Sequence, residues 1–403
     1  MDLHLIALAY PFFVLLIVAE VLWSQRRGLG LYRFADAITD LACGVGSQTL
    51  GAALGVLGIA AYVRAYDARV VTLPEGGAWI WVLGFLYVDF VFYWWHRWSH
   101  EAHFLWAGHV VHHQSEDYNL AVALRQEWLT HLTHIPFYLP LALVGFPWQV
   151  LATNVSISLL YQFWIHTEVI RRMGPYEWLF NAPMHHRVHH AINPQYLDKN
   201  YGGILIVWDR LFGTYQEETE PCVYGTTTPI ASWNTIWANW IVWQNMLDAA
   251  KQTAKWSDKL RVWWKSPAWS PPDLPQHPPH AVDRNTVVKY DTPVPTRLKV
   301  WLSAQLLTLV AAQAALLPWL RQLHESRLFW LAFANVLWGL LNVGGLLERK
   351  PWAQVSEMLR LVGTLALALL LTGLTHDASL EFGAPVCLVL LLALPRANRP
   401  SPR

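Results

Sequence analysis

Long apolar runs are the feature that most limits what this chain can fold into. Leu3–Trp23 and Leu41–Val63 are long and mostly apolar, and Ala78–Trp95 is shorter and carries Asp89. A helix needs about 20 such residues to cross the roughly 30 Å hydrocarbon core of a membrane. Hydrophobic residues make up 54% of the chain and charged residues only 14%, which does not suit a soluble surface. The sequence therefore predicts an all-α, multi-pass integral membrane helical bundle.

The rest of the chain adds shorter apolar runs and one proline-rich stretch. Residues 135–150 and 150–165 predict a helical hairpin that reaches part or all of the way across the membrane. The later apolar runs are Leu298–Leu320, Leu328–Leu347, Leu361–Leu374 and Gly383–Leu394. We therefore expect a membrane domain with a histidine-rich cap at residues 1–264, a proline-rich linker at 265–296 and C-terminal transmembrane helices at 297–403.

The distribution of basic residues predicts the orientation in the membrane. Cytoplasmic ends of spans are enriched in Lys and Arg. With the N-terminus outside, four basic residues near the spans fall on the outer side, namely Arg64, Arg69, Arg321 and Arg327. The inner side receives a larger set, which comprises Arg26, Arg27, Arg33, Arg97, Arg171, Arg172, Arg349, Lys350, Arg396, Arg399 and Arg403. Both histidine-rich regions then lie on the cytoplasmic face. The net charge of +1 gives no reason to expect a nucleic-acid partner.

Histidines are concentrated between the third apolar run and residue 190. The segment from His96 to His113 reads HRWSHEAHFLWAGHVVHH, and MHHRVHH follows later. A spacing of i, i+3, i+4 places three rings on one face of a helix. Imidazole binds Fe, Zn, Cu and Ni, and this many rings exceeds the four ligands of one structural zinc site. The pattern predicts two metal ions, held by His96, His100, His109, His112, His113, His166, His186, His189 and His190.

Neutral imidazoles leave a two-metal site strongly cationic, so nearby carboxylates are expected. Glu101 and Asp117 are the predicted catalytic carboxylates, with Glu101 nearest to the histidines. His185, Asp89 and Asn200 are candidates for a further ligand or for a contact to one. For Asp89 a buried hydrogen bond explains the residue equally well. A surface or interfacial role explains any single histidine, but it does not explain three spaced groups on one side of the membrane.

Several strings resemble the fatty acid hydroxylase and sterol desaturase superfamily of membrane di-iron enzymes, and its ether-lipid branch in particular. They are DFVFYWWHRWSHE, WAGHVVHHQSEDYNLAVALRQ, YQFWIHTEVI and HHRVHHAINPQYLDKNYGGILIVWDRLFGTY. The resemblance implies two iron ions on the nine histidines, with Glu101 at the position of that branch's acidic residue. It also implies oxidation of the carbon next to the ether oxygen of alkylglycerols, with fatty aldehyde and glycerol as products. Tetrahydrobiopterin would be the reductant.

Two alternative functions stay open at this stage. The same centre would also serve a hydroxylase or desaturase of a sterol, a carotenoid or an acyl chain. A non-enzymatic histidine-rich metal carrier or sensor is a further alternative, although transport favours sparse ligands along a path. Imidazole does not distinguish iron from zinc. The chain has no CxxC pair, GxGxxG turn or P-loop, so a redox metal site would need an external electron donor. The partners expected from the resemblance are a lipid substrate and O2.

Overall fold

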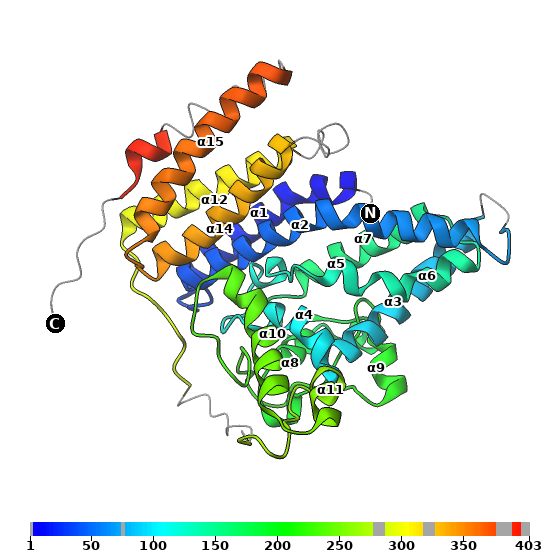
Figure 1. The fold of residues 1–403 in the computed structure, drawn as a ribbon. Helices are drawn as coiled ribbons and strands as arrows, with labels where there is room; N and C mark the ends of the chain where they lie inside the picture. Colours follow the sequence, from blue (N-terminus) through cyan, green and yellow to red (C-terminus); the bar gives the residue numbers. More distant parts are fainter. Residues whose placement is uncertain (1–2, 74–76, 277–286, 317–326, 376–388, 396–403) are drawn as a thin grey trace. The chain divides into compact units, whose positions relative to one another are not determined.

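The computed structural model describes residues 3–73, 77–276, 287–316, 327–375 and 389–395, and every regular element in these ranges is a helix (Figure 1). The helices divide between two compact units. Unit 1 contains residues 1–32, 53–230 and 239–289, and unit 2 contains residues 33–52, 231–238 and 290–403. Each unit therefore combines segments that are far apart in the sequence. The predicted division into three continuous domains stays a prediction.

Unit 1 contains most of the helices and all of the histidines in the predicted ligand set. Its helices include α1 (Leu3–Arg27), α3 (Ala78–Glu101), α4 (His103–His113), α5 (Thr130–Thr133), α6 (Ile135–Leu143), α7 (Trp148–Trp164), α8 (Pro183–His189), α9 (Val207–Phe212) and α11 (Trp256–Trp264). Three short 3₁₀ helices lie between them, at Val122–Leu124, Gly174–Trp178 and Pro194–Tyr196. Helices α2 (Phe34–Asp67) and α10 (Thr235–Gln252) contribute residues to both units.

The predicted helical hairpin is present as α6 and α7. Gly145 in the turn has φ +90°, and a Cβ there would lie 2.2 Å from the carbonyl oxygen of Val71, so only glycine fits. Pro147 precedes α7, where its missing N–H costs no hydrogen bond. Buried side chains from α2, α3, α6 and α7 form one apolar cluster that includes Tyr62, Val88 and Leu141. This cluster fixes the position of α3, whose far end carries histidines.

Unit 2 includes α12 (Thr296–Leu316), α14 (Arg327–Leu347) and α15 (Ala353–Thr375). Arg360 and Glu357 form a buried ion pair on α15, with 2.6 Å between Nη2 and Oε1. Asn342 of α14 donates to the same carboxylate over 2.8 Å. Charges inside an apolar bundle are costly unless they are paired and hydrogen-bonded, and here both conditions are met.

Five helices in the described ranges are long and apolar enough to span a membrane. They are Ala9–Arg27, Phe34–Asp67, Ala78–Glu101, Trp330–Leu347 and Ala353–Leu370. These helices confirm the first three predicted runs and the run from Leu328. The run from Leu361 lies inside the longer helix α15. The described part of the run from Leu298, residues 298–316, is helical in α12, which is not one of the five. Residues 383–388 of the run Gly383–Leu394 lie outside the described residues, and residues 389–393 are helical.

The described part of the predicted linker is irregular. Residues 265–276 and 287–295, within the predicted linker, contain neither helix nor strand, and residues 277–286 lie outside the described ranges.

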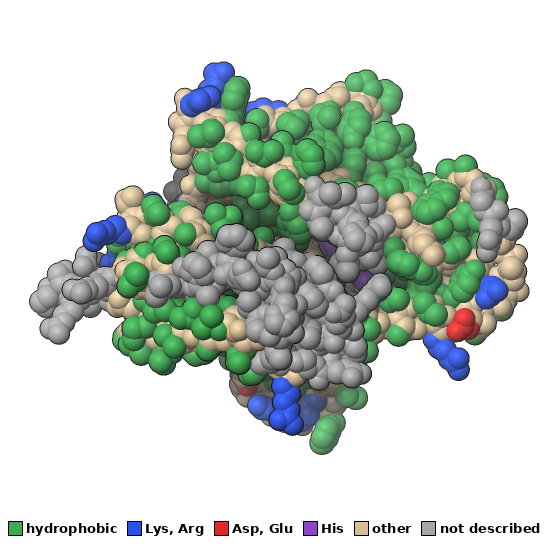
Figure 2. All heavy atoms as spheres, turned by 90° about the horizontal axis from the view of Figure 1, so that it is seen from above, with side chains coloured by type: hydrophobic (Ala, Val, Ile, Leu, Met, Phe, Trp, Pro, Cys, Tyr) green, Lys and Arg blue, Asp and Glu red, His purple; other side chains and the backbone are tan. Residues whose placement is uncertain are grey.

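Hydrophobic side chains cover much of the described surface in Figure 2, whereas Lys and Arg lie mainly at its margins. The candidate spans together with this surface indicate an integral membrane protein.

Candidate metal centre

Two helices joined by a sharp turn bring the first five histidines together. His96 and His100 lie one turn apart near the end of α3 and are buried. Ala102 is extended, with φ −116° and ψ 121°, and reverses the chain into α4. Helix α4 then carries the other three, which are His109, His112 and His113. The membrane-spanning helix thus ends inside the site.

The other four histidines come from the end of α7 and from α8. His166 lies two residues beyond the last residue of α7. Helix α8 begins with Pro183, and the backbone N–H of Ala182 donates to Nδ1 of His185 over 3.2 Å. This bond caps the start of the short helix. His186, His189 and His190 follow within one turn, and all are buried.

The nine rings form two groups, within each of which the candidate ligand atoms lie within 4.8 Å of one another. The first group is His96, His100, His109, His113 and His189, and the second is His112, His166, His186 and His190. Each HxxHH motif therefore gives its i, i+4 pair to one group and its middle histidine to the other. The three rings of each motif do lie on one face, with centroids 5.0–5.8 Å apart in the first motif and 4.7–5.3 Å apart in the second. The spacing did not predict that the middle ring joins the other group, to which it points because it is rotated by about 60–100° from its partners on the helix.

Backbone carbonyl groups fix the orientation of four of the rings. Nδ1 lies within hydrogen-bond distance of a carbonyl oxygen in each case: 2.8 Å for His96 and Tyr201, 3.0 Å for His112 and Arg125, 2.7 Å for His166 and Gln162, and 3.0 Å for His189 and Lys199. A carbonyl oxygen only accepts, so Nδ1–H is the donor and Nε2 carries the lone pair. Four imidazoles are thereby prepared to bind through Nε2.

These lone pairs face one another without a proton between them. Nε2 of His112 and Nε2 of His166 are 3.2 Å apart, although both rings already donate through Nδ1. Nε2 of His96 and of His189 is buried without a hydrogen-bond partner in the described part of the chain. Opposed lone pairs repel, and a cation between them would convert that repulsion into coordination. The donor set therefore fits metal ions, and the two groups indicate a metal-dependent site.

Burial also keeps the rings neutral, which metal binding requires. Burial and then the neighbouring His109 lower the pKa of His112 to about 4. Burial lowers the pKa of His189 to about 3, against a hydrogen bond to Lys199 that opposes the shift. At neutral pH these imidazoles are unprotonated without help from a metal.

Glu127 is the buried carboxylate that contacts a histidine of the groups. Its Oε1 lies 3.2 Å from Nδ1 of His109. Burial opposes its ionisation, but the hydrogen bond from His109 and the electrostatic interactions with His109 and His112 outweigh burial and lower the pKa of Glu127 to about 2. It therefore adds one negative charge beside the first group. Glu127 was not predicted from the sequence; it directly follows the string WAGHVVHHQSEDYNLAVALRQ, and its separation of 18 residues from His109 gives no sign of their contact.

The carboxylates predicted to be catalytic lie elsewhere. Glu101 is exposed and pairs with Arg97 over 2.8 Å on the outer side of α3, so the expectation that it is the carboxylate nearest to the histidines is wrong. Asp117 is buried in the loop after α4 and pairs with Lys289 over 2.7 Å. Neither residue belongs to the two groups found in the described residues. Their catalytic roles stay predictions.

The three further candidates hold the surrounding loops. Asp89 accepts hydrogen bonds from the backbone of Ile204 and Leu205 and from Nε1 of Trp208, at 2.8, 3.1 and 2.9 Å. Asn200, at φ 57°, bonds to the carbonyl oxygen of His185 and to the backbone of Gln216. His185 is buried beside the second group without joining it. All three therefore shape the loop between α8 and α9, whose carbonyl groups orient His96 and His189.

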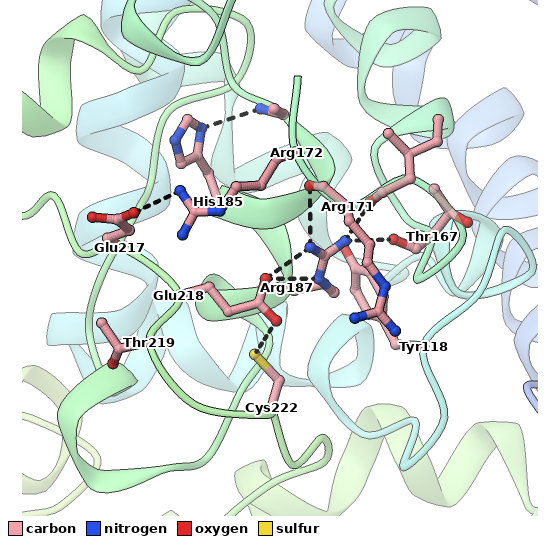
Figure 3. A network of polar contacts seen from close by, with 12 residues as sticks. Tyr118, Thr167, Arg171, Arg172, His185, Arg187, Glu217, Glu218, Thr219 and Cys222 are labelled. Carbon is pink, nitrogen blue, oxygen red and sulfur yellow. Dashed lines mark hydrogen bonds and ion pairs between the residues drawn. The ribbon is translucent and has the colours of Figure 1, made fainter. Parts of the chain in front are cut away.

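A buried arginine ties the last two histidine-bearing segments together (Figure 3). Arg187 donates from Nε and Nη2 to Glu218, at 3.0 and 2.7 Å. Its Nη1 donates to the carbonyl oxygens of Thr167 and Ile170, at 3.1 and 2.7 Å. The segment that follows His166 is thus held against α8, which carries His186. The only sequence signal for this role is the arginine inside HHRVHH.

Known proteins resemble this chain both at the site and over most of its length. The profile of the family described as fatty acid hydroxylase matches residues 81–214, which include the nine histidines. The alkylglycerol monooxygenase of Danio rerio is 37% identical over 88% of this chain and 80% of its own length. Those of Xenopus tropicalis and Homo sapiens are each 36% identical over 87% of this chain, and over 78% and 80% of their own lengths. No solved structure shows significant similarity.

Proposed function

This chain belongs to the alkylglycerol monooxygenase family and is a lipid-hydroxylating monooxygenase, and we propose that its own substrate is an alkylglycerol. In the proposed reaction, one oxygen atom of O2 enters a C–H bond of the carbon next to the ether oxygen. The other atom leaves as water, with two electrons and two protons from a reductant. The hemiacetal product then breaks its C–O bond to give a fatty aldehyde and a glycerol.

We propose that the two histidine groups each hold one iron ion. The ions would supply the O2 activation and the oxidising power that an unactivated C–H bond requires. The observation that carries this proposal is the convergence of buried ring nitrogens in two groups. Nε2 of His96 and of His189 has no hydrogen-bond partner among the described residues, and Nε2 of His112 lies 3.2 Å from Nε2 of His166 although both rings donate through Nδ1. Zinc would fit the same imidazoles, so the choice of iron rests on the family's chemistry.

The protein's own residues would perform three tasks. Carbonyl groups such as those of Tyr201 and Lys199 hold the rings in one tautomer and one orientation. Burial keeps bulk water away from the reacting carbon. Glu127 offsets part of the positive charge that two divalent ions bring to nine neutral ligands. The end of α3 at the site allows a lipid to keep its tail among the helices and its head at the surface.

The electron donor and the side of the membrane are further parts of the proposal. We propose an external reductant, tetrahydrobiopterin, because the resemblance of the histidine-bearing strings to the ether-lipid branch implies it. The excess of basic residues on one side of the spans favours a cytoplasmic site. A membrane-impermeant label that reached the His185 loop only from outside would contradict that orientation.

Turnover in a reconstituted system tests the proposed function. The iron-loaded protein would be incubated with O2 and an alkylglycerol, with and without tetrahydrobiopterin, and the fatty aldehyde measured. We expect aldehyde only when the pterin is present, with a loss of at least 100-fold in His186→Ala. The matched control is His131→Gln, since His131 lies in neither group. Oxygen incorporation into a sterol or acyl lipid without aldehyde would replace the proposed substrate by another lipid.

A further inference from the structure

Helix α11, in unit 1, has two faces of opposite character. Asp258 and Val262 are buried against the rest of the unit. On the opposite face, Trp256, Leu260 and Trp264 form a stripe at i, i+4 and i+8, and their side chains are 79%, 67% and 69% exposed. Three large apolar side chains in a row, open to solvent on so short a helix, are a costly surface for water to cover.

Positive charge surrounds this stripe. The segment from Lys251 to Lys265 contains five basic residues, which are Lys251, Lys255, Lys259, Arg261 and Lys265. Its acidic residue, Asp258, is buried and paired with Arg261 over 3.0 Å. Two exposed carboxylates lie beside this segment: Asp248 pairs with Lys251 over 4.0 Å, and Asp273 accepts hydrogen bonds from Thr253 and Ala254. The five basic residues outnumber these carboxylates, so the net charge around the stripe is positive and complements an anionic surface.

The helix also lies at the right depth to meet a membrane surface. The candidate span Ala78–Glu101 ends two residues before His103. The backbone N–H of His103 donates to the carbonyl oxygen of Lys265, the residue directly after α11, over 2.9 Å. The ring of Trp264 lies 5.8 Å from that of Phe104 at the start of α4. One end of α11 is thus attached to the point at which a membrane span ends.

We propose that α11 lies in the headgroup layer of an anionic lipid membrane. The stripe of Trp256, Leu260 and Trp264 enters the boundary with the acyl chains, and the basic residues on both sides contact lipid phosphates. A helix with an aromatic apolar face and a basic margin binds membranes in this way. Helix α11 packs against α4, which carries three of the nine histidines. Binding of α11 to the membrane would therefore also help to hold α4 in place.

A fluorescent label on the stripe tests the proposal in the full-length protein. Leu260→Cys would be labelled with an environment-sensitive nitrobenzoxadiazole probe in nanodiscs, and Thr219→Cys, on an exposed loop of the same unit, provides the matched control. Unmodified protein corrects for labelling of the native cysteines. We expect spin-labelled lipid to quench the probe at position 260 at least twofold more than at position 219. Iodide in the buffer should quench the probe more strongly at position 219 than at position 260.

The outcomes separate a membrane from other occupants of the stripe. Stronger quenching at position 260 by iodide than by lipid would overturn the proposal, because the stripe would then face water. Protection from both quenchers would overturn it too, since a second protein chain would cover the stripe.

Lipid charge provides a second test of the same helix. Quenching of the probe at position 260 by spin-labelled lipid should be at least twofold stronger in nanodiscs that contain phosphatidylglycerol than in nanodiscs of phosphatidylcholine alone. The variant K251Q/K255Q/K265Q should lose this difference; it leaves intact both Arg261, which pairs with the buried Asp258, and Lys259, whose Nζ caps the end of α10. Equal quenching in both lipids, or an unchanged difference in the variant, would overturn the assignment to anionic lipid.

Discussion

At the scale of single residues, the site depends on hydrogen-bond acceptors that fix the tautomer and the orientation of the imidazole rings. The sequence was sufficient to predict the nine histidines, because their spacing is visible in the chain. It was not sufficient to find their partners, because the carbonyl groups of Tyr201 and Arg125 carry no residue signature. The prediction of Glu101 as the nearest carboxylate has the same cause. Glu101 is next to His100 in the sequence, whereas Glu127 contacts His109 only because the chain after α4 folds back toward that helix.

Removing the charge of Glu127 tests its role beside the first group. Glu127→Gln keeps an oxygen for Nδ1 of His109 but loses the negative charge. We expect one of two bound ions to bind 10- to 100-fold more weakly, as measured by competition with a chelator. Glu101→Gln is the matched control, since it makes the same change at an exposed carboxylate. Equal weakening in both variants would show that Glu127 has no special role.

A half-buried histidine outside the two groups, whose Nε2 is shielded from solvent, should make the fold sensitive to acid. Burial lowers the pKa of His134 from 6.5 to about 3, so the unfolded chain takes up a proton between these values and the folded chain does not. Stability is therefore complete above about pH 6.5 and falls as the pH is lowered. His134→Gln should remove about 2 kcal/mol of the loss between pH 6.5 and 4, seen in unfolding titrations. Identical pH slopes in the two proteins would contradict this explanation.

At the scale of elements, apolar length and proline placement predicted most helices, including the hairpin of α6 and α7. The sequence did not reveal how the short helices α8 and α9 are held. Their loop depends on contacts across more than 100 residues, such as those of Asp89 on α3 with Ile204 and Leu205. The alternative kept for Asp89, a buried hydrogen bond, describes these contacts. The sequence does not identify the groups that donate to Asp89, because every residue except proline carries the same backbone N–H.

Loss of the Asp89 carboxylate should loosen this loop. Asp89→Ala leaves two buried backbone N–H groups and the indole N–H of Trp208 without an acceptor. We expect the free energy of unfolding to fall by about 3 kcal/mol. Asp273→Ala is the control, because that exposed carboxylate accepts from Thr253 and Ala254 and should cost less than about 1 kcal/mol. A similar loss in both variants would mean that Asp89 does not anchor the loop.

At the scale of the whole molecule, the sequence predicted an all-helical membrane protein and its cluster of histidines, but not how these histidines divide into two groups. The two metal ions themselves stay a prediction. Five of the nine rings belong to one group and four to the other, and both groups draw on widely separated segments. Segregation of the chain into two units was also not predictable, because each unit is assembled from discontinuous stretches. The central claim is that these nine histidines hold two ions in two distinct places.

Metal content per chain, measured by mass spectrometry on iron-loaded protein, tests that claim most directly. We expect about two ions in the unmodified protein, one for each group. His112→Ala, in the second group, and His189→Ala, in the first, should each retain about one ion, and the double variant should retain almost none. One ion in the unmodified protein, or unchanged content in both single variants, would contradict the two-metal account.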